Sequence, residues 1–343
     1  MATIALSGGG TAGHVLPALA LISELKKHFD KIIYLGGNGM EQDLVPKNGI
    51  PFYQTSNIKF SRSNLISNLK IPVALNNAAN EALEILKREK VDIVFGKGGY
   101  ASLPAVIGAK KLKLPIVIHE SDFKMGLANK FALRFCDAVI TSFPETNGGT
   151  YIGTPIRDEI FNGDKERAYR KYGLNKNLPT ILIFGGSSGS TIINDVVFKT
   201  AKELVTLGNV IHVTGKNEKR RLYLEGYHST PYAEDIYDLY AVSHVVVTRG
   251  GANSLAEATG LGKRVICIPL PKSKHSRGDQ VDNAKSYYSR GLIDLLPQSE
   301  LSSDELLKRI KTELTQKERP VLTDTPNAKI VDKILEVLIN QDR

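Results

Sequence analysis

Two glycine-rich stretches of this 343-residue chain could bind phosphate groups. The first runs from Ser7 to His14 and the second from Gly185 to Ser190, and each follows an apolar, strand-like segment and precedes a helix-like one. Glycines allow a tight turn, so that backbone N–H groups and the positive end of a helix can meet a phosphate. Thr11 and Ser187 add hydroxyl donors. Such turns need glycine in any case, but the recurrence of the pattern in both halves favours phosphate binding.

A third stretch, Thr248 to Glu257, also follows a strand-like segment and begins a helix-like one. Its first N–H groups could hold a diphosphate. The carboxylate of Glu257 presents two acceptor oxygens, which suit the two vicinal hydroxyls of a ribose. The alternative is that Glu257 is an acid near the start of a helix, where the helix dipole favours it.

Signatures of other nucleotide-binding proteins are absent. A dinucleotide dehydrogenase carries an acid near the end of its second strand, whereas those ends here are Leu-Gly-Gly at 35–37 and Val-Thr-Gly at 213–215. Neither glycine loop ends in Gly-Lys-Ser/Thr, and no Asp-x-Asp motif occurs, so we expect no cofactor and no metal. What remains is a pair of anion-binding loops facing each other across a cleft, which suits two phosphorylated substrates.

The elements that must position these residues alternate between strand-like and helix-like segments in both halves. The predicted strands are 3–6, 31–35, 93–95, 116–118, 138–141, 180–184, 210–213, 245–248 and 265–268. A helical period covers 78–87, and a final amphipathic helix is expected over 328–339. This alternation predicts the α/β class, with two Rossmann-like parallel sheets joined by the glycine-rich segment 147–155.

Length and composition narrow the class of protein further. A chain of 343 residues exceeds the size at which one hydrophobic core usually stops growing, so we expect two domains. The net charge of +9 favours an anionic ligand or surface, but the basic residues are scattered, which disfavours nucleic acid. No apolar run approaches the ~20 residues of a transmembrane helix. Cys136 and Cys267 suggest no disulfide, and the amino terminus lacks a secretory signal, so we expect a reducing compartment.

Seven motifs along nearly the whole chain carry a resemblance to a known family. They are GGGTAGH at 8–14, KGGY at 97–100, HES at 119–121, GLANK at 126–130, GGS at 185–187, RGGA at 249–252 and GDQVDNA at 278–284. Together they resemble the MurG family of UDP-N-acetylglucosamine:lipid I N-acetylglucosaminyltransferases of peptidoglycan synthesis. The resemblance implies the GT-B fold, in which two Rossmann-like domains flank a deep cleft. It implies an acceptor and membrane-contact domain over 1–155, a UDP-N-acetylglucosamine-binding domain over 156–326, and a C-terminal helix over 327–343 that can pack back on the first domain.

The resemblance also implies roles for single residues. The positions associated with catalysis are His14 and Glu120, and those associated with the lipid I acceptor are Thr11, Gly13, Tyr100 and Asn129, with Asp122 where a side chain touches the donor sugar. The positions associated with the donor are Arg157, Ser187, Tyr232, Ala233, Ile236, Ala252, Asn253, Ser254, Glu257, Asp279 and Gln280. Among these, 232–236 is expected at the uracil, Glu257 at the ribose, and Arg157 at the diphosphate.

Three departures from the family's pattern concern sugar recognition rather than the class of reaction. The familiar His-Glu-Gln-Asn motif is His-Glu-Ser-Asp at 119–122, Asp279 replaces the first of a frequent glutamine pair, and Ser188 replaces a glutamine of the second loop. The residues for which a purely structural role is an open alternative are His14, His119, Tyr100 and Asn129.

The implied reaction is an inverting displacement. The 4-hydroxyl of N-acetylmuramic acid on lipid I attacks the anomeric carbon of the donor and gives lipid II and UDP. Neutral imidazole, with an unperturbed pKa of ~6.5, can accept the hydroxyl proton as the bond forms, so His14 is the expected base, with Glu120 and Asp122 as alternatives. A glycolipid synthase, a UDP-N-acetylglucosamine 2-epimerase and a non-catalytic nucleotide-sugar-binding module stay open.

The segment 58–71 mixes bulky apolar residues with Lys59, Arg62 and Lys70. Such a segment can insert shallowly into a bilayer while its basic groups meet anionic lipid. We therefore expect a peripheral protein on the cytoplasmic face of the cell membrane, in contact with anionic inner-leaflet lipid. A cell-wall synthesis complex is a further candidate partner. The alternative is an ordinary loop and core helix.

Overall fold

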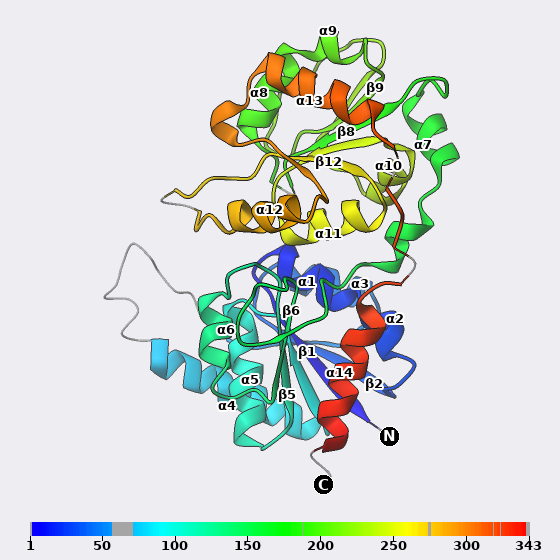
Figure 1. The fold of residues 1–343 in the computed structure, drawn as a ribbon. Coiled ribbons are helices and arrows are strands. Elements are labelled where there is room, and N and C mark those ends of the chain that lie inside the picture. The colour runs from blue at the N-terminus through cyan, green and yellow to red at the C-terminus, as the bar shows by residue number, and fades with distance from the viewer. Residues whose placement is uncertain are drawn as a thin grey trace. The chain divides into compact units, whose positions relative to one another are not determined.

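The computed structural model describes residues 2–56, 71–186, 188–273, 276–317, 319–322 and 324–340. The chain divides into two compact units, Met1–Arg157 with Thr325–Arg343 and Asp158–Asp324 (Figure 1). The division therefore falls just after the segment 147–155 that we expected to be the linker. Part of that segment instead forms β7 (Thr150–Tyr151), which pairs in parallel with β6 (Ala138–Thr141) and so extends the first sheet by one strand.

The first unit contains a parallel sheet with helices on both faces. Its remaining strands are β1 (Thr3–Ser7), β2 (Lys31–Gly36), β3 (Phe52–Gln54), β4 (Ile93–Gly96), β5 (Ile116–Glu120) and β6 (Ala138–Thr141). Its helices are α1 (Ala12–Leu19), α2 (Ile22–Leu25), α3 (Glu41–Lys47), α4 (Ile71–Arg88), η2 (Tyr100–Ser102), α5 (Leu103–Lys111), α6 (Leu127–Ala132) and α14 (Asn327–Asn340). The strand order β3-β2-β1-β4-β5-β6-β7 reverses direction between β1 and β4. Rossmann-like sheets bind ligands at such a reversal, beyond the carboxyl ends of the strands.

Alternation along the central strand divides the first core into two layers. Ile4 and Leu6 of β1 face a cluster that includes α1, α2 and α14, whereas Ala5 faces a cluster with α4, α5 and α6. This follows from the two-residue period of a strand that is buried on both faces. Ile330 and Ile334 bring α14 into the first layer, and Figure 1 shows this helix (red) lying along the first unit.

Polar contacts fix the beginning of α14. Asn327 donates from its side-chain amide to the carbonyls of Ala20 and Ile156, at 3.1 and 2.7 Å, and accepts from the backbone N–H of Ile156 at 3.0 Å. Asn327 is buried, so these bonds satisfy an amide that would otherwise be costly to bury. The last helix of the chain is therefore a structural part of the first unit.

The second unit repeats the parallel architecture. Its strands are β8 (Thr180–Phe184), β9 (Asn209–Val213), β10 (Tyr227–Thr230), β11 (Val245–Thr248), β12 (Arg264–Cys267) and β13 (Asp294–Leu295). Its helices are η3 (Asp158–Asn162), α7 (Lys165–Tyr172), α8 (Thr191–Lys199), α9 (Ala201–Leu204), α10 (Ile236–Val242), α11 (Ala252–Gly260), α12 (Asp279–Ser289), η4 (Gln298–Glu300) and α13 (Ser303–Thr315). The order β10-β9-β8-β11-β12-β13 places its reversal between β8 and β11.

All nine predicted strands are present, and the described residues form four further strands that were not predicted, β3, β7, β10 and β13. Each of these four lies at an edge of its sheet. They are two to four residues long. Such short segments carry little of the hydrophobic periodicity on which prediction depends.

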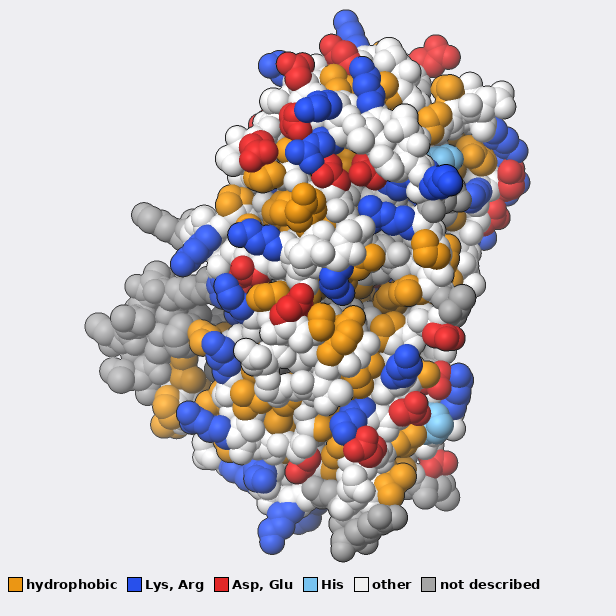
Figure 2. Space-filling view, in the orientation of Figure 1, with side chains coloured by type: hydrophobic (Ala, Val, Ile, Leu, Met, Phe, Trp, Pro, Cys, Tyr) orange, Lys and Arg blue, Asp and Glu red, His pale blue; other side chains and the backbone are white. Residues whose placement is uncertain are grey.

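Within the described residues, no helix combines the length and hydrophobicity that a membrane crossing requires. On the face shown in Figure 2, basic side chains are interspersed with acidic and apolar ones. Residues 58–70 of the predicted membrane-contact segment lie outside the described residues, and Ile71 begins α4.

Candidate functional site

The first glycine loop, residues 8–11, joins β1 to α1 at the strand reversal of the first unit. Glu41, the first residue of α3, extends its side chain into this loop and is 1% exposed. Its carboxylate accepts hydrogen bonds from the backbone N–H groups of Gly10 and Gly37, both at 3.1 Å. A backbone pocket that the sequence predicts for a phosphate thus holds an internal anion.

His14 lies one turn into α1, beside the loop that follows β4. A Cβ atom added at Gly99 would lie 3.1 Å from His14 Cδ2 and 2.7 Å from the carbonyl oxygen of Gly9. Gly99 also has a φ of +76°, which disfavours any other residue. The glycine pair at 98–99 therefore allows the first loop, the imidazole and the β4 loop to approach closely, which explains this motif without a direct role in binding.

Glu120, at the end of β5, is buried and anchors the loop that follows. Its two oxygens accept hydrogen bonds from the backbone N–H groups of Asp122 and Gly126 and from the side-chain amide of Asn129, at 2.9 to 3.0 Å. The pKa of Glu120 is raised because burial outweighs the opposing effect of these hydrogen-bond donors. A carboxylate with three donors orders residues 121–126 whether or not it also accepts a substrate proton.

Lys97, just after β4, is a buried cation below the first glycine loop. Its backbone N–H donates to the Ser7 carbonyl at 2.6 Å, and its ammonium group donates to the Ser121 hydroxyl. Burial lowers the pKa of Lys97 to about 8, against the opposing effect of the nearby Glu120 and Asp122 carboxylates. The departure at 121–122 from the family's pattern therefore lies next to a cation that can neutralise it.

His119 has a structural role. It is fully buried, and its Nε2 lies 2.9 Å from the Gly153 carbonyl, which requires that nitrogen to donate. Burial lowers the pKa of His119 well below its ordinary value, with a further lowering by Lys97. A neutral histidine bonded to the backbone tethers the chain near the end of the first unit. These contacts support the structural alternative that the sequence left open.

The second glycine loop follows β8 at the strand reversal of the second unit. Gly189 has a φ of +75°, and a Cβ atom there would lie 2.2 Å from the Thr214 carbonyl oxygen. Ser190 is the N-cap of α8, and its hydroxyl accepts from the N–H of Ile193 at 3.4 Å. The loop is thus pressed against the backbone that follows β9, and its end is fixed by a helix cap.

Arg249, after β11, connects the second loop to the neighbouring strand. It is 7% exposed, and its guanidinium donates to the Ser190 hydroxyl at 2.6 Å and to the Ile268 carbonyl at 3.0 Å. Burial lowers the pKa of Arg249, but a guanidinium stays protonated in proteins. The second loop is therefore supported by a permanent internal cation.

The starts of α11 and α12 meet next to Arg249. A Cβ atom at Gly250 would lie 2.4 Å from the Gln280 carbonyl oxygen, and the Asn283 amide donates to the Gly250 carbonyl at 3.2 Å. Glu257 is the sixth residue of α11 and is half-buried. These contacts bring two predicted donor-binding segments to one edge of the second sheet.

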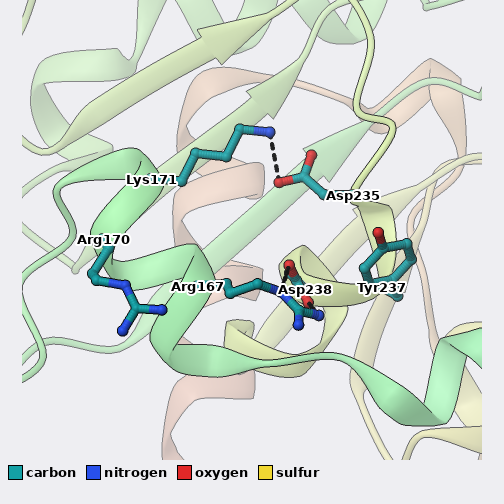
Figure 3. A pocket seen from close by; sticks show the side chains of 6 residues that line it. All are labelled: Arg167, Arg170, Lys171, Asp235, Tyr237 and Asp238. Carbon is teal, nitrogen blue, oxygen red and sulfur yellow. Dashed lines mark hydrogen bonds and ion pairs between the residues drawn. The ribbon is translucent and has the colours of Figure 1, made fainter.

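A surface hollow of about 480 Å³ lies between α7 and α10 of the second unit (Figure 3). Figure 3 shows Arg167 facing Asp238, and Lys171 reaching Asp235. Arg167 makes a bidentate contact with the buried Asp238, at 2.7 and 2.8 Å, and Lys171 lies 2.8 Å from Asp235. None of the lining residues belongs to a glycine loop or to α11. We interpret these ion pairs as structural contacts that hold α7 against the start of α10.

In the described part of the chain, no three His, Cys, Asp or Glu side chains come close enough together to hold a metal ion. Cys136 is half-buried and Cys267 is buried, and both are free thiols.

Comparison with known proteins identifies the family. The model of the glycosyltransferase family 28 N-terminal domain matches residues 4–141, and that of the glycosyltransferase family 28 C-terminal domain matches residues 180–337. The chain belongs to glycosyltransferase family 28. It is therefore a glycosyltransferase, and its two parallel-sheet units are those of the GT-B fold.

Individual relatives agree with this family 28 assignment. The UDP-N-acetylglucosamine--N-acetylmuramyl-(pentapeptide) pyrophosphoryl-undecaprenol N-acetylglucosamine transferase of Clostridium perfringens strain SM101 is 40% identical over 348 residues, covering 98% of this chain and 97% of the relative. Its counterpart in Clostridium tetani is 40% identical over 90% of this chain and 88% of its own length.

Solved structures give the same result. The MurG crystal structure from Acinetobacter baumannii matches with a TM-score of 0.74 and 26% identity, covering 98% of this chain and 100% of that one. The calicheamicin glycosyltransferase CalG4, at a TM-score of 0.66 and 13% identity, covers 99% and 94% and shows the fold alone. The resemblance to the MurG family is confirmed.

The predicted site residues of this family 28 enzyme fall into two groups. Those described in the first unit are Thr11, Gly13, His14, Tyr100, Glu120, Asp122, Asn129 and Arg157. Those described in the second unit are Tyr232, Ala233, Ile236, Ala252, Asn253, Ser254, Glu257, Asp279 and Gln280. Ser187 lies outside the described residues.

Several of these side chains already have internal partners. Asn129 is buried and bonds to Glu120, and the Gln280 side-chain oxygen accepts from the Leu270 N–H at 3.0 Å. Asp279 accepts from Arg277 at 2.8 Å. Tyr232 is half-exposed, and the Lys216 ammonium lies 5.0 Å from the centre of its ring.

The sequence analysis did not identify Glu41. It included Lys97 and Arg249 in motifs but assigned neither residue a role. The signal for Glu41 was an acid four residues after Gly37, at the end of the glycine-rich turn that follows β2. For Lys97 and Arg249 the signal was a basic residue directly after a buried strand at each reversal.

Proposed function

We propose that this chain transfers N-acetylglucosamine from UDP-N-acetylglucosamine to the 4-hydroxyl of N-acetylmuramic acid in lipid I, which gives lipid II. The observation that carries this proposal is the 40% identity over 98% of the chain to a relative whose name states that transfer. The glycine loops at the two strand reversals add support, because each lies where Rossmann-like sheets hold phosphorylated ligands.

The donor would bind to the second unit. The first N–H groups of α11 would meet the diphosphate, Glu257 would accept from the ribose hydroxyls, and Tyr232 to Ile236 would line the uracil. UDP gains negative charge as it leaves. The end of a helix and the nearby Arg249 offset such charge without a metal, with Arg157 and Ser187 as further donors.

The chemical step would take place at the acceptor-binding residues of the first unit. The acceptor oxygen forms a bond to the anomeric carbon as the bond from that carbon to the UDP oxygen breaks, so the configuration inverts. The hydroxyl proton passes to His14 late in this step. Glu120 would hold the 121–126 loop, and Thr11, Gly13, Tyr100 and Asn129 would contact the acceptor, with Asp122 near the sugar.

The acceptor carries a lipid, so the enzyme would work at the cytoplasmic face of the membrane as a peripheral protein. The net charge of +9 favours contact with anionic lipid. Replacing Phe60 and Leu65 with serine tests the predicted contact segment: flotation with anionic vesicles should fall while turnover of a soluble acceptor persists. Unchanged flotation would reject this segment.

The test of the function is a mass-resolved assay with UDP-N-acetylglucosamine and a short-chain lipid I analogue. We expect one added N-acetylhexosamine per acceptor, a β-configured link and free UDP, with full activity in EDTA. A product that is an epimerised nucleotide sugar would indicate a 2-epimerase. UDP binding without turnover would indicate a binding module. A strict requirement for added Mg²⁺ or Mn²⁺ would overturn the metal-free mechanism.

A further inference from the structure

A buried carboxylate occupies the backbone pocket of the first glycine loop. Glu41 is 1% exposed, and its two oxygens each accept one backbone N–H, from Gly10 and from Gly37. These two donors come from different turns, one after β1 and one after β2. A single carboxylate therefore joins two loops at the carboxyl edge of the first sheet, as a bound anion would.

Three glycines leave the room that this carboxylate needs. Added Cβ atoms at Gly9, Gly39 and Gly36 would lie 2.3, 2.5 and 2.9 Å from atoms of the Glu41 side chain. Real Cβ atoms essentially never come so close. None of the three has a positive φ. Their backbone conformation therefore does not require glycine, whereas the position of Glu41 does.

The contact also bears on the imidazole. Gly10 is followed directly by Thr11, the N-cap of α1, and His14 lies one turn further. The Thr11 side chain itself makes no cap hydrogen bond at this helix start. The hydrogen bond from Gly10 to Glu41 therefore anchors the residue directly before Thr11, and with it the point from which α1 and His14 project.

We propose that Glu41 is a positioning residue that takes the place of an anion in the first glycine loop and thereby sets the start of α1 and the position of His14. The loop N–H of Gly10 and that of Gly37 are then occupied, so the acceptor diphosphate is held by other groups. The catalytic part of this proposal rests on the proposed function, in which His14 is the base, whereas the contact of Glu41 with the two loops does not.

Two variants of Glu41 test the catalytic consequence. Glu41→Ala removes both acceptors, and we expect kcat with the lipid I analogue to fall by about 100-fold, the typical cost of a misplaced catalytic group. Glu41→Gln keeps the shape but has one oxygen, so its NH₂ group faces one of the two N–H donors, and we expect a loss of roughly 10-fold. The KM for UDP-N-acetylglucosamine should stay within about 2-fold, because the donor binds to the other unit.

A double-mutant cycle tests the contact itself. Gly9→Ala should lower the unfolding temperature of the wild-type chain because its new methyl group meets the Glu41 carboxylate. In the Glu41→Ala background the same change should cost little, since that carboxylate is gone. Gly49→Ala is the matched control in the same unit. Gly49 has a φ of +72° and no atom within 4 Å of an added Cβ, and its N–H donates to the Pro46 carbonyl rather than to Glu41. Its cost is therefore backbone strain and should be equal in both backgrounds.

The two measurements separate this proposal from the proposed function. If the wild-type chain does not transfer the sugar, the proposed function fails, while the thermal cycle still measures the contact between Gly9 and Glu41. Equal costs of Gly9→Ala in both backgrounds would overturn the position of the carboxylate. In an active enzyme, a kcat of Glu41→Gln and Glu41→Ala within about 2-fold of wild type would overturn the positioning role.

Discussion

The two glycine loops share a sequence pattern but are supported by opposite charges. In the first unit the Glu41 carboxylate accepts from the loop N–H of Gly10. In the second unit the Arg249 guanidinium donates to the hydroxyl of Ser190, where the loop ends. Both loops follow the first strand of their sheet and both lie at a strand reversal. Two loops with the same sequence pattern and the same place in their sheets therefore contact side chains of opposite charge.

The difference indicates which ligand each loop suits. Part of the anion-binding capacity of the first loop is used within the chain by Glu41, whereas the second loop lies against the buried cation Arg249, which donates to a hydroxyl and a carbonyl oxygen. A diphosphate that gains charge as it leaves is better placed next to the second loop. We therefore expect the charged leaving group in the second unit and the proton transfer in the first.

The sharpest way to separate the two units is His14→Ala. We expect kcat to fall by about 100- to 10,000-fold, the usual cost of a lost general base, while the Kd of UDP changes by less than about 2-fold. The measurement is kcat against pH, together with calorimetric binding of UDP. Near-normal turnover with an unchanged acidic limb would transfer the role of base to Glu120 or Asp122.

A pair of alanine substitutions tests how the second loop is held. Gly189→Ala combines a positive φ with a methyl group 2.2 Å from the Thr214 carbonyl oxygen, a backbone atom that cannot move aside cheaply. We expect a loss of about 2 to 4 kcal/mol in the free energy of unfolding. Gly186→Ala is the control, since its φ is +87° and an added Cβ meets nothing within 4 Å, so strain alone should cost about 1 to 2 kcal/mol.

The comparison with the first loop predicts which of these losses can be rescued. The clash of Gly9→Ala is with one side chain and should disappear with Glu41→Ala, whereas no single side-chain truncation should rescue Gly189→Ala. Urea unfolding of each variant measures this. Equal losses at Gly186 and Gly189 would mean that the backbone contact with Thr214 is not tight in solution.

The architecture could be predicted from the sequence because its central strands are long and apolar on both faces. The strand over 180–184 is an example, since every residue in it is buried. The edge strands could not be predicted. β7 is two exposed residues, Thr150 and Tyr151, inside a stretch whose glycines indicate a turn. Its pairing comes from the neighbouring β6 rather than from its own side chains.

The parts of the candidate site that depend on local motifs could be read from the sequence, whereas the contacts between residues distant in the sequence could not. The loops at 8–14 and 249–257 follow from glycine and helix-start patterns alone. Glu41 is 31 residues from Gly10, and nothing in the spacing shows that α3 directs its first side chain back into the β1 loop. The same holds for Arg249, which is 59 residues from Ser190.

A ribose contact would strengthen the assignment of the donor to the second unit. Glu257→Ala should weaken UDP by about 10- to 100-fold, as expected for hydrogen bonds to a charged acceptor, but should weaken 2'-deoxy-UDP much less. Calorimetry with both nucleotides gives the ratio. Equal losses for the two would remove Glu257 from the ribose and leave it as an acid that stabilises α11.

The smallest effect concerns the two buried cations. Lys97 and Arg249 both follow the strand next to the reversal, but only the lysine can lose its proton in an accessible pH range. The pKa of Lys97 is lowered from 10.5 to about 8, chiefly by burial. Between those values the unfolded chain binds more protons than the folded chain, so the free energy of unfolding rises with pH. The cost of burying the charge is complete below about pH 8 and is lost as the pH approaches 10.5.

Comparison of the wild type with Lys97→Met isolates this contribution, because the two chains share every other titrating group. From about pH 7.5 to about 9.5 the wild type should gain roughly 2 kcal/mol at most relative to the variant. Arg249→Met is the control, and its difference from wild type should not change over that range because the guanidinium stays charged. Urea unfolding at both pH values measures the two differences. If the difference in the free energy of unfolding between wild type and Lys97→Met is constant or falls with pH, the Lys97 ammonium keeps its proton in the folded chain. Both units would then contain a buried side chain that stays positively charged over this pH range.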